Sequence, residues 1–232
     1  MKLLAIETAS DACSVALWLD GEKCSRFEIA PRKHNELVTP MLTSVLAEAG
    51  CKLSDLDALA FGRGPGSFTG VRIAASYVQG LSCATGLPVV PVSSLQTVAQ
   101  GIYRLHGYKQ VIVAFDARLA EVYWGAFALD DQGIMQSVRQ EAVEKPVQIQ
   151  ATFSGDWMGA GKGWGVYGQI LQERLGAAVI SRQMPDVYPD AQDVASLAVV
   201  AFSNGLAVCA SDAVPVYLRD QVVSVSVELP KS

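Results

Sequence analysis

The stretch GRGPGSFTGVR, residues 62–72, is a glycine-rich turn that runs directly into an apolar helix. Its glycines allow backbone angles that other residues resist, and Ser67 or Thr69 is placed to cap the exposed N–H groups of the helix. A Walker phosphate loop requires a lysine and a hydroxyl residue at the helix start, whereas Gly70 is followed here by valine and arginine. The stretch therefore predicts a fold-making turn, with general attraction of anions to the free helix amides as the alternative.

The helix predicted after this turn, residues 69–85, has hardly any polar face. Such a helix is either central to a large core or covered on its second side by a partner, and a chain of 232 residues permits both. Its small residues would let another helix approach closely; they are Ala74, Ala75, Gly80 and Ala84.

The composition is that of a folded protein, with 50% hydrophobic and 18% charged residues, enough for one large core or two smaller ones. No apolar run approaches the roughly 20 residues of a membrane helix. Glu7 makes the N-terminus acidic too early for a signal peptide. These features predict a cytoplasmic protein that has no membrane partner. The net charge of −5 offers no basic field for gripping nucleic acid alone, so any RNA must be held mainly by another protein.

Metal-binding patterns are absent from the sequence. The five cysteines are widely spaced without a Cys-x-x-Cys pair, which indicates reduced core thiols. His34 and His106 lack metal-ligand spacing. Glu7 and Asp11 flank the turn after the first strand, where two carboxylates can act as acid and base or hold a cation, although turn and capping roles are commoner.

The densest polar cluster combines Asp116, Arg118 and Glu121 with Tyr123 in an apolar neighbourhood. We interpret it as a structural salt-bridge cluster in a strand–turn–strand unit. No Gly-x-Ser-x-Gly elbow accompanies the serines. From these residues alone, the chain is a globular α/β protein with no assigned activity.

Hydrophobic periodicity divides the chain into two predicted lobes, residues 1–106 and 107–232. The first lobe has predicted strands over 2–7, 14–19, 23–29, 56–61 and 88–92, and helices over 35–49, 69–85 and 94–103. The second has predicted strands over 110–115, 121–129 and 134–138, a glycine-crowded loop region after Pro146, and helices over 166–175 and about 190–202. The last helix is a candidate for packing back on the first lobe, and residues 214–229 are an edge strand or a loose tail.

Six blocks closely resemble the bacterial TsaB (YeaZ) family, in the expected order. They are LAIETAS at 4–10, SVAL at 14–17, the 62–72 turn, PVSSL at 91–95, DARLAEVY at 116–123 and PVYLR at 215–219. The resemblance implies an actin-like ATPase (ASKHA) fold, an α/β architecture of two related lobes, each with a mixed sheet and packed helices. It also implies a role in making threonylcarbamoyladenosine next to the anticodon of tRNAs that read codons beginning with adenine.

The resemblance further implies a non-catalytic pseudo-enzyme that works with a TsaD-like catalytic subunit and a TsaE-like ATPase. ATP and metal are expected on those partners, and no catalytic, cofactor-binding or metal-binding residue is expected on this chain. Transfer RNA is expected to be contacted only through the complex, and free chains to form a self-dimer. The catalytic relative carries a histidine motif where this chain has Ser93 and Ser94, and hydroxyls are poor substitutes for imidazole on a transition metal.

Two alternatives come from other classes of protein. A glycoprotease-like peptidase would need a nucleophile or a metal that the sequence does not display. A stand-alone actin-like kinase would need a phosphate loop in the second lobe, and residues 116–118 lack the glycines for one.

The two helices 35–49 and 69–85 are predicted to form the surface that meets the catalytic subunit or a second copy, because together they present more apolar surface than a monomer usually exposes. The residues expected on this surface are Leu37, Met41, Val45, Val71, Arg72, Ala75, Val78 and Ser82.

Overall fold

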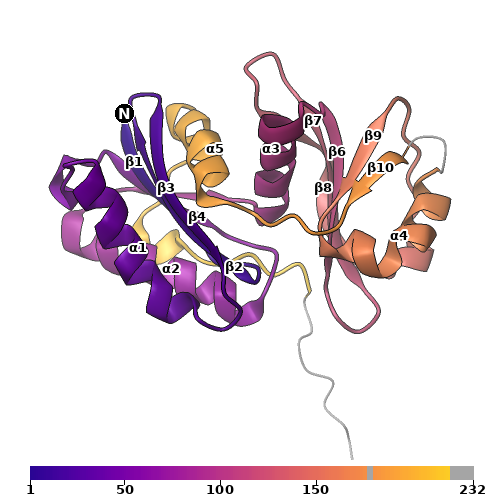
Figure 1. The fold of residues 1–232 in the computed structure, drawn as a ribbon, viewed down its shortest axis with the longest axis horizontal. Coiled ribbons are helices and arrows are strands. Elements are labelled where there is room, and N and C mark those ends of the chain that lie inside the picture. Colours follow the sequence, from indigo (N-terminus) through magenta and orange to yellow (C-terminus); the bar gives the residue numbers. More distant parts are fainter. Residues whose placement is uncertain (177–179, 220–232) are drawn as a thin grey trace, which may run out of the picture.

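The computed structural model describes residues 1–176 and 180–219, which form two lobes side by side, each around a five-stranded sheet (Figure 1). The first sheet contains β1 (Lys2–Glu7), β2 (Ala12–Leu19), β3 (Glu22–Ile29), β4 (Ala58–Gly62) and β5 (Val89–Val92). The strand order is β3-β2-β1-β4-β5. Strand β2 pairs antiparallel with both β1 and β3, whereas β4 pairs parallel with both β1 and β5.

The second sheet repeats this plan. It contains β6 (Gln110–Asp116), β7 (Val122–Leu129), β8 (Met135–Glu144), β9 (Trp157–Ala160) and β10 (Ile180–Met184). Its order, β10-β9-β6-β7-β8, is the first order read from the other edge, with the same antiparallel and parallel pairings. Two mixed sheets of one topology confirm the α/β fold of two related lobes that the resemblance implies.

In the part of the chain that the structure describes, five helices cover the sheets: α1 (His34–Glu48), α2 (Phe68–Thr85), α3 (Ser94–His106), α4 (Lys162–Leu175) and α5 (Ala191–Ser203). Helices α1 and α2 share a core with one face of the first sheet, and α5 packs on its other face. Helix α4 shares a core with one face of the second sheet, and α3 with the opposite face. Short 3₁₀ turns occupy Leu53–Asp55, Pro146–Gln148 and Ala210–Asp212. Among the described residues, no helix has both the length and the hydropathy to span a bilayer.

The two central helices, α3 and α5, exchange lobes. Helix α3 follows the last strand of the first sheet but packs on the second, whereas α5 follows the second sheet but packs on the first. The helices meet between the lobes (Figure 1), where Arg104 of α3 forms an ion pair with Asp193 of α5 at 2.7 Å. The lobe boundary at 106/107 therefore stays a prediction about folding units, because each helix packs across it.

The first-lobe elements match their predicted types, with ends shifted by up to three residues. The prediction of a loop for the glycine-crowded region after Pro146 is wrong. This region contains β9, and α4 begins in it at Lys162, four residues before its predicted start; β10 follows the helix. Strand β8 runs to Glu144, well past its predicted end. Residues 220–229 of the predicted tail lie outside the described residues. We call residues 213–219 the C-terminal strap; this segment runs from α2 toward the second lobe.

Most residues expected on the partner surface lie instead in the first lobe's own core. Val45 and Val78 are fully buried, because they sit on the faces of α1 and α2 that pack against the first sheet. Leu37 is half-buried and Arg72 is exposed. The other buried members of the set are Met41, Val71, Ala75 and Ser82.

Candidate functional site

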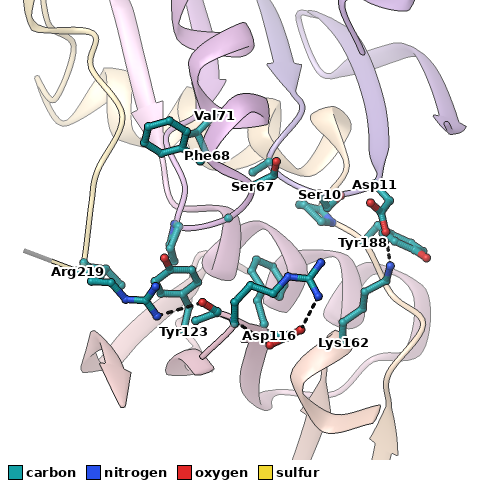
Figure 2. A pocket seen from close by; sticks show the side chains of 18 of the residues that line it. Ser10, Asp11, Ser67, Phe68, Val71, Asp116, Tyr123, Lys162, Tyr188 and Arg219 are labelled. Atoms are coloured by element: carbon teal, nitrogen blue, oxygen red, sulfur yellow. Dashed lines mark hydrogen bonds and ion pairs between the residues drawn. The ribbon is translucent and has the colours of Figure 1, made fainter. Parts of the chain in front are cut away.

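A cleft of about 570 Å³ lies between the two lobes. The connection between β10 and α5 lines part of it through Val187, Tyr188 and Pro189. Four turns line it as well: the β1–β2 and β4–α2 turns of the first lobe, and the β6–β7 turn and the β9–α4 junction of the second. Because the sheets share one topology, these are two pairs of equivalent turns that face each other. The C-terminal strap lines the remaining side, and Figure 2 shows side chains from all six segments around the cleft.

The glycine-rich turn is locked to the β1–β2 turn by its backbone. The Ser67 N–H donates to the Ala9 carbonyl at 2.7 Å, and the Thr8 hydroxyl donates to the Gly70 carbonyl at 2.7 Å. A Cβ on Gly70 would lie 2.0 Å from the Thr8 carbonyl oxygen, so only glycine permits this approach. The Ser67 side chain caps α2 by accepting from Gly70 N–H. The predicted fold-making turn is thus confirmed, and it also lines the cleft.

Lys162 and Asp11 form an ion pair that joins the lobes across the cleft (Figure 2). The hydrogen bond to Asp11 raises the pKa of Lys162 above its ordinary value, and the ammonium also lies 5.3 Å from the Tyr188 ring centroid. Lys162 begins α4 directly after Gly161, which has a φ of 98°. Sequence reasoning missed this residue, although the pattern GAGKGWG at 159–165 gave a signal equivalent to the first glycine-rich turn.

The predicted polar cluster divides into two pairs. Arg118 reaches back to Asp116, through its backbone N–H at 2.9 Å and its guanidinium at 3.3 Å, and its side chain is 86% exposed. Glu121 pairs instead with Arg219 of the strap, which also donates to the Ala117 carbonyl at 3.0 Å. The salt bridge between Asp116 and Arg118 lies within the predicted cluster, whereas Glu121 pairs outside it, because three consecutive residues of positive φ in the β6–β7 turn direct Arg118 away from Glu121.

An aromatic–cation stack closes the strap side of the cleft. The Arg72 guanidinium lies 3.6 Å from the Phe68 ring centroid and donates to the Tyr217 hydroxyl at 2.9 Å. Because Phe68 and Arg72 belong to α2 and Tyr217 to the strap, this stack fastens the strap to the first lobe.

Glu7 and Asp11 are not brought together as an acid–base pair. Asp11 faces the cleft, whereas Glu7 is fully buried and accepts from Ala9 N–H at 2.6 Å and from the Ser94 hydroxyl at 2.8 Å. Burial raises the pKa of Glu7 to about 7, and the two hydrogen bonds offset part of that shift. Glu7 therefore has a structural setting without access to the cleft.

The two serines at the start of α3 are occupied by internal hydrogen bonds. The Ser93 side chain caps α3 by accepting from Gln96 N–H and donates to Glu141 of β8. The pKa of Glu141 is raised, mainly by burial. The Ser94 hydroxyl is held by Glu7.

The histidines also lie apart. His34 lies at the start of α1, with Nε2 2.8 Å from the Ser10 carbonyl oxygen, and His106 ends α3. Over residues 1–176 and 180–219, no group of three or more His, Cys, Asp or Glu side chains is arranged to hold a metal ion. The cleft therefore offers cations, carboxylates and aromatic rings, and the described residues within it form no recognisable catalytic set.

Comparison with known proteins gives one consistent family. The family model described as "TsaD: tRNA N6-adenosine threonylcarbamoyltransferase" matches residues 28–227. The TsaB protein of Escherichia coli K12, a tRNA threonylcarbamoyladenosine biosynthesis protein, is 42% identical over 96% of both chains. TsaB of Haemophilus influenzae is 38% identical over 96% of this chain and 95% of the relative. The solved structure of YeaZ from Pseudomonas aeruginosa is 45% identical and superposes with a TM-score of 0.88, over 94% of this chain and 99% of that one.

Proposed function

This chain belongs to the TsaB family of tRNA threonylcarbamoyladenosine biosynthesis proteins, and on that premise we propose that it is a non-catalytic subunit of a threonylcarbamoyl transferase complex. Its partners in this proposal are a TsaD-like catalytic subunit and a TsaE-like ATPase, which bring the ATP and the metal. The modified position is the adenosine next to the anticodon of tRNAs that read codons beginning with adenine.

The proposal of a non-catalytic role is supported by the hydrogen bonds that Ser93 and Ser94 make inside the protein. The family resemblance implies that the catalytic relative has its histidine motif at this place, and both serines are buried. One hydroxyl caps a helix and donates to Glu141, and the other is bound by Glu7. Both hydroxyl protons are therefore used inside the protein, where they stabilise the junction between the lobes, and neither is donated to a ligand in the cleft.

The exposed face of α1 and α2 supports a partner surface there. A shallow hollow of about 280 Å³ lies between the two helices, lined by Asn35 of α1 and by Arg72 and Ser76 of α2 among others. Ser76 and Gly80 are exposed one turn apart on α2. Small side chains at such spacing let a partner helix approach closely, so we place the subunit contact on this face rather than on the buried residues of the same helices.

The negative net charge supports contact with tRNA through the complex rather than by this chain alone. A cytoplasmic location and self-dimerisation of the free chain stay predictions.

The second candidate, a glycoprotease-like peptidase, has less support. The described part of the cleft shows no nucleophile paired with a general base, and the described residues show no metal-binding group. A protease assay with and without chelator separates the two functions.

The deciding experiment reconstitutes tRNA modification from this chain, a TsaD-like subunit and a TsaE-like ATPase, omitting each in turn. We expect threonylcarbamoyladenosine only when all are present, and co-elution of this chain with the catalytic subunit. Modification at the full rate without this chain contradicts the proposal, as does modification by this chain alone.

A further inference from the structure

Glu7 and Ser14 are directly opposite partners on the antiparallel strands β1 and β2. Both side chains are completely buried. Glu7 holds the start of α3 by accepting from the Ser94 hydroxyl at 2.8 Å. Ser14 holds the start of α5 by accepting from the Ala191 N–H at 2.8 Å. One cross-strand pair therefore binds the first turn of both central helices.

These two helices carry the chain between the lobes. Helix α3 belongs by packing to the second sheet, and the chain enters it directly from β5 of the first. The chain leaves the second sheet at Met184 and reaches the first lobe at α5. The angle between the lobes thus depends on how firmly the first turns of α3 and α5 are held at the end of the first sheet.

The surroundings of Glu7 keep its carboxylate in one place. A Cβ on Gly62 would lie 1.8 Å from Glu7 Oε2, so the carboxylate occupies the space that the missing side chain leaves on β4. The other oxygen accepts from Ala9 N–H at 2.6 Å and so fixes the β1–β2 turn, which lines the cleft. The charged or titratable groups that act on it are Asp190, just before α5, and Cys13 of β2.

We propose that Glu7, Ser14 and Ser94 form a buried latch between the first sheet and the two central helices, which sets the angle between the two lobes. Its hydrogen bonds are buried, so each is worth more than the half-exposed Lys162–Asp11 ion pair at the mouth. The Arg104–Asp193 pair joins α3 to α5 but ties neither helix to β1 or β2. Releasing the latch frees the first turn of α3 from β1 and the first turn of α5 from β2, which lets the lobes open as a hinge motion.

The test measures the distance between the lobes directly. Spin labels are placed on the exposed native Cys83 of α2 and on a cysteine at the exposed Gln169 of α4, with Cys24, Cys51 and Cys209 replaced by serine. Double electron–electron resonance then compares the parent chain with S14A, S94A and the double variant S14A/S94A. The control is S196A, which removes a hydroxyl from α5 that bonds to Gln192 and Lys23 away from the latch.

We expect S196A to reproduce the parent distance distribution, and each latch variant to shift or broaden it, most strongly in the double variant, while far-UV circular dichroism stays unchanged. Should the double variant not fold, S94A and S14A decide separately, because each removes a single hydroxyl. Superimposable distributions for the parent, S94A and S14A overturn the proposal. None of these outcomes depends on partner subunits. The experiment therefore tests the latch independently of the proposed function.

Discussion

Lys162, the first residue of α4, forms an ion pair with Asp11 of the β1–β2 turn and thereby joins the two lobes across the cleft. The two residues come from turns that are not equivalent in the duplicated fold: Asp11 follows the first strand of its sheet, and Lys162 follows the fourth. The strap joins the lobes on the other side through Arg219 and Glu121. Within the described residues, these two ion pairs link the lobes on opposite sides of the cleft.

The Lys162–Asp11 pair contributes little to stability because both side chains are 45% exposed. We expect K162A to lower the free energy of unfolding by about 0–1 kcal/mol at low salt, and the loss to disappear at high salt as the charges are screened. Thermal unfolding of K162A and of the exposed control K109A, each at low and high salt, measures this. A loss of several kcal/mol, or one insensitive to salt, would show that the pair is more than a surface contact.

Alanine substitutions at two glycines of α2 are expected to change stability in opposite directions. An added Cβ at Gly70 meets the Thr8 carbonyl oxygen at 2.0 Å, so G70A must push the helix away from the β1–β2 turn. An added Cβ at Gly80 meets nothing within 4 Å. We expect G70A to be destabilised by about 2 kcal/mol or more, and G80A to be stabilised by up to about 1 kcal/mol, because alanine favours a helix interior over glycine. Chemical denaturation checks both, and a neutral G70A would refute the close approach.

Removal of Arg219 is expected to cost more stability than removal of Arg118. The Arg118 side chain is 86% exposed, so R118A should stay within about 0.5 kcal/mol of the parent. Arg219 is mostly buried and binds both Glu121 and the Ala117 carbonyl, so R219A should cost about 1–3 kcal/mol. Equal melting temperatures for the two variants would argue against the strap as a link between lobes.

Local sequence signals predicted the first lobe well. Its strands are continuous apolar or alternating runs between clear turn residues, and α2 is bounded by the capping residue Ser67 and by Gly86, which is in the left-handed conformation. Strands β4 and β5 are as short as β9 and β10, so length does not explain why the latter two were missed. The glycines around β9 have the composition of a loop, and β10 is mostly polar. Those glycines are needed for close packing: a Cβ on Gly159 would meet the Trp164 ring at 2.7 Å.

The site was harder to predict because its parts are far apart in the sequence. Burial of Val45 and Val78 follows from which face of each helix meets the sheet, and two helices with few charged residues do not reveal that face. The Lys162–Asp11 and Arg219–Glu121 pairs join positions 151 and 98 residues apart, so only the tertiary fold brings them together. The sequence made α5 a candidate for packing on the first lobe, where it lies, whereas no local signal indicated that α3 packs on the second sheet.

Glu7 predicts a pH dependence of stability. Its pKa is raised by burial from 4.5 to about 7, so between these values the folded chain binds more protons than the unfolded chain. Stability from this group is therefore full below pH 4.5 and is lost as the pH rises toward 7. Burial also raises the pKa of Glu141 and Asp193, which adds a slope of the same sign. We expect E7Q to keep the part of the pH dependence that comes from Glu141 and Asp193, so its free energy of unfolding should fall less steeply with pH than that of the parent. Urea titrations at several pH values measure both slopes, and equal slopes for E7Q and the parent would contradict the raised pKa.

The partner surface on α2 makes the last prediction. Ser76 is exposed beside the hollow between α1 and α2, so S76R should leave the melting temperature unchanged. In the complex, the added guanidinium would be buried close to Arg72 without a carboxylate to pair with, so binding of a TsaD-like subunit should weaken at least about tenfold, or 1.4 kcal/mol. Q169R on exposed α4 is the matched control, and it should bind normally.

The variant V78D differs from S76R because Val78 is fully buried. We expect V78D to destabilise the first lobe by about 3 kcal/mol or more, so it cannot report on the interface. Size-exclusion chromatography with the partner, alongside thermal melting, separates these effects. A folded S76R that still co-elutes with parental affinity would move the subunit contact off this face of α2.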